Sequence, residues 1–68
     1  MSVRYHVLSP FIAIKPLEDG YKIITIPSGC TIEISGEVQR SGLVDVAFEG
    51  ETVAVFLRDI DGRTERLD

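Results

Sequence analysis

The sequence predicts an all-β fold: a small barrel of five to six short antiparallel strands with one short helical turn near residues 58–60. Three observations lead to this prediction. Short runs rich in β-branched residues alternate with turn residues along the chain. No stretch shows sustained helical spacing of apolar residues. So few strands in 68 residues cannot build a two-sheet sandwich of ordinary size, whereas closing a strongly bent sheet hides its edges.

Prolines and glycines separate the strands expected in the first part of the chain. Residues 3–8 alternate apolar and polar side chains, as in a half-buried strand. Pro10 interrupts this strand because proline has no amide donor for a continuing ladder. A second strand is expected at residues 11–15, with Ile12 and Ile14 facing the core and Pro16 ending it.

The middle of the chain predicts two further strands. After a turn at residues 17–20, the third strand is expected at 21–26, with Ile24 and Ile26 on one face. The Pro27-Ser28-Gly29 turn leads into a fourth strand at 30–35. A polar loop over residues 36–42 follows.

The last part of the chain predicts a tight hairpin and a short helical segment. The strand at 43–48 places Val44, Val46 and Phe48 on one face, and a turn at 49–51 leads into a strand at 52–57. One helical turn follows at residues 58–60. Asp61-Gly62 is a second turn signal, after which 63–67 forms either a last edge strand or a frayed tail.

Length and composition predict a single domain over residues 1–68 in a reducing compartment. The chain has one cysteine, so no disulfide within the chain can support the small core. No run approaches the roughly 18 apolar residues that span a bilayer. Arg4, His6 and Pro10 interrupt the N-terminal stretch that a signal peptide would need. We therefore expect a small cytoplasmic protein of bacterial type, not bound to membrane.

The net charge of −4 disfavours nucleic acid as a partner. The surplus lies in residues 41–68, which hold three basic and seven acidic side chains, while charges cancel in residues 1–40. Nucleic-acid binding depends on cationic neutralisation of phosphates, so an acidic domain suits it poorly. A local basic face on an acidic domain keeps a nucleic-acid-associated barrel open as an alternative.

The residue types that carry chemistry form no catalytic or metal-binding pattern. Cys30 and His6 would need a particular strand register to form a dyad, and a lone cysteine is commonly a small buried hydrophobe. The 59–62 segment lacks the further carboxylates of a calcium loop. The sequence therefore predicts no cofactor, no metal and no enzymatic activity. An enzyme whose site forms only between the subunits of a homo-oligomer is a second alternative.

Residues 26–34, 42–46 and 49–56 together resemble the bacterial SH3-like small barrels. In that superfamily a Pro-x-Gly turn opens a long strand, and a Gly-apolar-x-x-Val strand later forms a hairpin with its successor. A single helical turn then precedes a short last strand. The resemblance implies a small barrel, but those domains often carry tryptophan at the positions of Leu43 and near Ala54. This chain has no tryptophan, so cell-wall or proline-peptide binding is not implied.

Apolar residues on both faces of several strands point to a surface for protein binding. Phe11, Ile23 and Leu43 lie opposite to the residues expected to face inward, and Phe56 does so on the last long strand. Contiguous exposed apolar area marks an interface, although bending of a small sheet can also bury part of both faces. We predict a noncatalytic interaction module that self-associates or binds another protein. Its predicted contact residues are Phe56, Phe11, Leu43 and Arg58.

Overall fold

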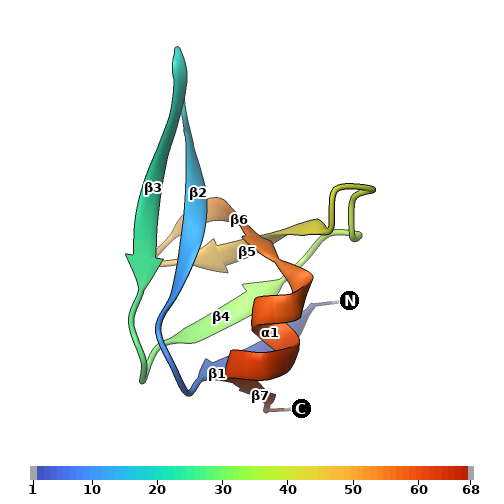
Figure 1. Ribbon diagram of the computed structural model, residues 1–68. Helices are drawn as coiled ribbons and strands as arrows, with labels where there is room; N and C mark the ends of the chain where they lie inside the picture. The colour runs from blue at the N-terminus through green and yellow to red at the C-terminus, as the bar shows by residue number, and fades with distance from the viewer. Residues whose placement is uncertain (1, 68) are drawn as a thin grey trace.

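The computed structural model describes residues 2–67 and contains seven strands and one short helix (Figure 1). The elements are β1 (Val3–Val7), β2 (Phe11–Leu17), β3 (Gly20–Ile26), β4 (Thr31–Ile34), β5 (Leu43–Phe48), β6 (Glu51–Phe56), α1 (Leu57–Arg63) and β7 (Thr64–Arg66). All strand pairs are antiparallel, in the order β3-β2-β6-β5-β4-β1-β7. The all-β prediction is confirmed. The expected five to six strands are seven, because the C-terminal segment pairs with β1 as an edge strand.

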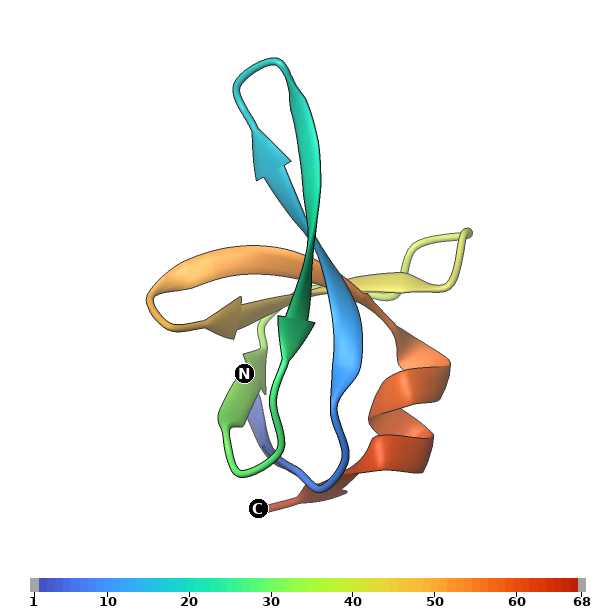
Figure 2. The same ribbon diagram turned by 60° about the vertical axis from the view of Figure 1, so that its left-hand side comes forward.

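The sheet is open, so the expected barrel closure is not shown. Among the described strands, β3 and β7 are the two ends of the order and do not pair with each other. Instead the sheet bends sharply where β2 meets β6, since the pair Ile14–Ala54 alone joins these two strands in register. The β2–β3 hairpin consequently projects away from the body and crosses the β5–β6 hairpin (Figures 1 and 2).

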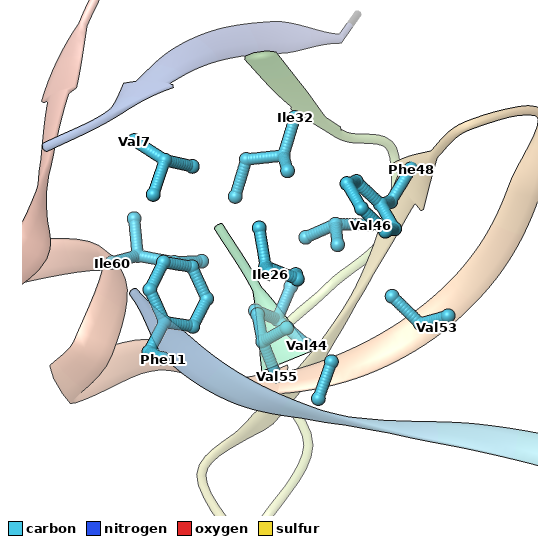
Figure 3. Close-up of a cluster of buried hydrophobic side chains, with 11 residues drawn as sticks. Val7, Phe11, Ile26, Ile32, Val44, Val46, Phe48, Val53, Val55 and Ile60 are labelled. Carbon is cyan, nitrogen blue, oxygen red and sulfur yellow. The ribbon is translucent and has the colours of Figure 1, made fainter. Parts of the chain in front are cut away.

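The concave side of this bent sheet holds the core. Side chains from six strands and the helix converge there (Figure 3), and they are Val7, Phe11, Ala13, Ile26, Ile32, Val44, Val46, Phe48, Val53, Val55 and Ile60. Backbone hydrogen bonds extend the β1–β4 pairing beyond His6 and Thr31, since the Val7 amide donates to the Cys30 carbonyl and the Gly29 amide to the Val7 carbonyl, both at 2.8 Å. Bending therefore encloses the core without a closed ladder.

The predicted orientation of β5 is confirmed, and that of β2 is wrong. Val44, Val46 and Phe48 are buried as expected. In β2, however, Phe11 is only 5% exposed and Ala13 is buried, whereas Ile12 is 47% exposed. The register explains the difference. Phe11 lies opposite Ile26, which is fully buried, and directly opposed residues share one face of a sheet.

β2 also continues through Pro16 to Leu17 instead of ending at residue 15. Proline is tolerated in a strand where its missing amide faces no partner. Pro16 lies beyond the Ile14–Ala54 pair, on the part of the hairpin that is paired only with β3. The missing amide therefore removes no ladder hydrogen bond to β6.

The hairpin predicted between β5 and β6 forms, but its turn is shorter than the expected 49–51 because Glu51 belongs to β6. Glu49 and Gly50 are its two central residues, since Phe48 pairs directly with Glu51. Both have positive φ, 51° and 78° respectively. Two positive φ angles define the type I′ turn, whose twist matches that of the flanking strands. The predicted hairpin is confirmed.

The helical segment is longer than the single turn expected at 58–60. Helix α1 continues through Asp61 and Gly62, so the predicted second turn at these residues is wrong. Ile60 is buried in the core and anchors the helix, which outweighs the modest cost of a helical glycine. At its end the Arg63 carbonyl accepts the amides of Leu8 and Ser9. The helix is thereby tied to β1 and the segment after it.

Candidate functional site

One face of the β2–β3 hairpin is apolar and open to solvent. On β2 the residues that alternate with the core-facing set are Ile12, Ile14 and Pro16. Their partners across the ladder are Thr25, Ile23 and Tyr21 in that order, so all of them share the outer side of the pleat. None of these residues is charged. Tyr21 is 69% exposed and Ile23 51%.

This surface continues onto β6 and β5, where the half-buried Asp45 lies opposite Ala54 on the same side. Ala54 lies opposite Ile14, and Phe56, on the same side of β6 as Ala54, lies opposite Leu43. Ala54, Phe56 and Leu43 are half-buried. We call the whole surface the outer apolar face, and it comprises Ile12, Ile14, Pro16, Tyr21, Ile23, Leu43, Ala54 and Phe56.

The exposed area of this face is as large as the patches that mark binding sites. A large apolar side chain presents roughly 150–250 Å² in total. The exposed fractions of Ile12, Tyr21 and Ile23 therefore leave roughly 250–400 Å² of mostly apolar surface in contact with water. Patches of about 300–600 Å² are the largest on typical monomers and are often functional.

A shallow hollow at the base of the hairpin borders the outer apolar face. Its lining residues come from the segment before β2, from β2, from β6 and from α1, and they are Pro10, Phe11, Ile12, Phe56, Arg58, Asp59 and Arg63. We call it the Arg58 hollow. A second shallow depression on the other side of Phe56 and Arg58 is lined by Ser41, Gly42 and Leu57 as well.

Arg58 and Arg63 give the hollow a positive character within an acidic protein. The Arg58 guanidinium carbon lies 5.2 Å from the centre of the Phe56 ring, a distance at which a cation attracts the face of an aromatic ring. Arg63 Nε lies 3.4 Å from Asp59 Oδ1, one helical turn away. Arg58 thus contacts the Phe56 ring, while the Asp59 carboxylate beside it pairs with Arg63. The hollow combines an aromatic wall with the Arg58 guanidinium, which forms no ion pair with any carboxylate of residues 2–67.

The structure brings together three of the four predicted contact residues. Phe56 and Leu43 form a cross-strand pair, and Arg58 covers the Phe56 ring. Phe11 does not lie on the surface. It is packed in the core and contributes only to the floor of the Arg58 hollow. Its position follows from the reversed orientation of β2.

The sequence analysis did not place Ile12, Ile14 and Tyr21 among the residues of this surface. Every residue from 11 to 14 is apolar, so alternation gave no indication of which pair faces outward. Tyr21 is the second residue of β3 and lies opposite Pro16, a pairing that follows only from the observed extension of β2. Ile23, which was expected on the outer side, does lie there.

Cys30 and His6 do not form a dyad. His6 lies opposite Thr31 in the β1–β4 pair, one register position from the level of Cys30. Successive residues in a strand point to opposite faces. Cys30 packs against the core as a half-buried free thiol, whereas His6 shares the opposite face with Thr31. Within the described part of the chain, no three histidine, cysteine or carboxylate side chains gather in a metal-binding group.

Two further observations, on membrane spans and on similarity to known proteins, point to no particular function. In residues 2–67 the helix is far too short to cross a bilayer. No family model matches this chain, and neither a curated protein nor a solved structure does so. The candidate functional site therefore consists of the outer apolar face and the Arg58 hollow.

Proposed function

We propose that this chain is a small noncatalytic protein-interaction module that binds its partner through the outer apolar face. One observation carries the proposal: large apolar side chains from β2 and β3 form an exposed surface whose hairpin part carries no charge, and half-buried side chains of β6 extend it. Removing such a surface from water contributes roughly 25 cal/mol per Å². A partner protein supplies the matching apolar surface that this gain requires.

The order of the elements supports an SH3-like relationship for this module. The Pro27-Ser28-Gly29 turn precedes β4, and a loop separates β4 from the β5–β6 hairpin. A short helix then leads into a short last strand. This is the order that the resemblance implies. Leu43 occupies one position where those domains often have tryptophan and Ala54 lies near another, and here both belong to the outer apolar face. We therefore infer a partner that presents aliphatic and aromatic side chains.

The charge distribution favours a protein partner over a nucleic acid. The hairpin part of the outer apolar face has no cation, and the nearest arginines, Arg58 and Arg63, lie at one end of it. A nucleic acid would need a row of cations along its phosphates. The free thiol of Cys30 fits a reducing compartment, which is why we propose a cytoplasmic location.

Photo-crosslinking tests this function directly. A benzophenone side chain replaces Tyr21 or Ile23 in one set of variants, and Leu17 in the control. Leu17 is 47% exposed on the same hairpin but lies on the opposite side of the pleat. We expect positions 21 and 23 to give adducts of discrete mass in cells, and position 17 to give none. Equal adducts from all three positions, or none from 21 and 23, would contradict the proposal.

A further inference from the structure

We infer that the partner of the outer apolar face is a second copy of this chain, an inference that rests on the proposed function. In this dimer the two β2–β3 hairpins pack face to face about a two-fold axis. Tyr21 of each copy occupies the Arg58 hollow of the other copy. A symmetric interface of this kind requires that one surface contain both a protruding group and a matching recess.

The protruding group lies on the outer apolar face and the recess borders it, so a two-fold axis midway between them places each against its counterpart in the other copy. Tyr21 is the most exposed of the large hydrophobic side chains in the described chain and lies near the hairpin tip, opposite Pro16. Ile12, a lining residue of the hollow, lies four residues before Pro16 on the same side of β2. At about 3.3 Å per residue this separates protrusion and recess by roughly 13 Å. The Ile14–Ile23 pair lies midway and falls on the axis.

The chemistry of the hollow suits a tyrosine side chain. Phe56 provides an aromatic wall, and Arg58 and Arg63 provide guanidinium groups at the rim. Guanidinium groups are attracted to the face of a tyrosine ring, and neighbouring aromatic rings stabilise each other in offset or edge-to-face contact. The hollow also contains the Asp59 carboxylate, which can accept a hydrogen bond from a phenol.

The charges on the chain favour this face over others for self-association. Two copies that each carry a net charge of −4 repel one another at most orientations. The hairpin part of the outer apolar face has no charged residue, and Lys15 and Lys22 lie on the opposite side of the pleat. Contact through this face therefore brings no like charges directly together across the hairpins.

The available area predicts a weak, reversible dimer. The exposed side chains, the half-buried Ile14 and Phe56, and the rim of the hollow amount to roughly 500 Å² per copy, or about 1,000 Å² in total. This total lies at the lower limit of specific interfaces. We expect dissociation constants in the micromolar range, at about 1–100 µM.

Sedimentation velocity over a concentration series is the first test. Between about 1 µM and 1 mM we expect the wild type to shift from monomer to dimer. Tyr21→Ala is expected to weaken the dimer at least about thirtyfold, the loss typical of a buried aromatic anchor. Arg58→Ala is expected to weaken it as well, and the control Leu17→Ala to leave it unchanged. These side chains are exposed at the surface of the monomer, and circular dichroism verifies that each variant folds.

Disulfide trapping in a Cys30→Ser background tests the arrangement. A mixture of Tyr21→Cys and Ile12→Cys chains should form crosslinks more rapidly than either chain alone. Ile23→Cys should crosslink with itself, and Lys22→Cys, on the opposite side of the same strand, should not.

A different dimer could form if the unpaired edges of β3 from two copies paired with each other. Hydrogen exchange of backbone amides distinguishes that dimer from the face-to-face dimer. Edge pairing would slow exchange of the β3 amides that face away from β2, whereas face-to-face packing leaves them accessible. Slowed exchange on dimerisation, or a dimer indifferent to Tyr21→Ala, would overturn the inference. A monomer at every concentration would also overturn it. If position 21 then crosslinks to a different protein in cells, the proposed function stands without the homodimer.

Discussion

The sharpest test of the core is a comparison of two adjacent residues, Phe11 and Ile12. The structure buries Phe11 beneath β2 and exposes nearly half of Ile12 on the other side. Alanine at position 11 removes a buried aromatic ring and leaves a cavity, which costs about 3–5 kcal/mol. Alanine at position 12 removes a half-exposed side chain. Full burial of an isoleucine is worth about 1.5–3 kcal/mol, so we expect a loss of about 1 kcal/mol.

These magnitudes are large relative to the stability of so small a domain. At about 0.05–0.15 kcal/mol per residue, 68 residues give roughly 3–10 kcal/mol for unfolding. Phe11→Ala is therefore expected to unfold a large part of the population, while Ile12→Ala remains folded. Urea denaturation followed by circular dichroism measures both, at a protein concentration low enough to keep the chain monomeric.

The milder variant Phe11→Leu keeps the comparison measurable if Phe11→Ala does not fold. It retains most of the apolar volume and is expected to cost about 1–1.5 kcal/mol. An Ile12→Ala loss equal to or larger than the Phe11→Ala loss would refute the orientation of β2. It would also remove Ile12 from the outer apolar face, together with the argument built on that face.

Three further predictions concern the turn, the helix and one ion pair. Gly50→Ala is expected to lower the free energy of unfolding by about 1–2 kcal/mol, because the φ of 78° strains any residue with a Cβ. The control Gly20→Ala places its Cβ in open space at an ordinary φ, so the same urea titration should show no loss or a gain in stability. Ile60→Ala is expected to cost about 2–5 kcal/mol by calorimetry, and a loss below about 1 kcal/mol would mean that the helix is not anchored by this side chain. The Lys15 Nζ–Glu51 Oε2 contact of 2.8 Å is expected to give a coupling energy below about 1 kcal/mol in a double-mutant cycle, because both side chains are partly exposed; a larger value that persists in high salt would contradict this.

The side of a strand that faces the core was predictable from sequence where a polar residue separates the apolar ones. In β5, Asp45 separates Val44 from Val46 and thereby fixes which side faces the core. In β2 no polar residue precedes Lys15, so two apolar sets compete for the core. Only the pairing of Phe11 with Ile26 decides between them, and that pairing depends on contacts between strands.

The C-terminal elements show a similar division. The apolar residue that anchors the helix, Ile60, falls within the turn predicted from sequence. The extension of the helix through Asp61-Gly62 was not predictable, because local preference favours a turn there and the buried side chain overrides it. The pairing of Thr64–Arg66 with β1 was one of two options, and the strand option is confirmed.

The candidate surface was predictable only where the strand orientation was. Phe56 and Leu43 lie next to strongly patterned core residues, so their outward placement followed from sequence. Ile12 and Tyr21 belong to the hairpin whose pattern is ambiguous, and the Arg58 hollow unites segments that are far apart in the chain. No local pattern contains that juxtaposition.

The pleat of β2 separates side chains that support the core from side chains that face solvent within one strand. Phe11 and Ala13 face the core, and changes there are limited by stability. Ile12 and Ile14 face outward, and beyond Ile14 the hairpin no longer pairs with β6. Substitutions at the outward positions are therefore expected to change the solvent-facing surface at a smaller cost to folding than substitutions at Phe11 or Ala13. If the proposed function holds, the hairpin is the place to alter binding specificity while the remaining sheet stays constant.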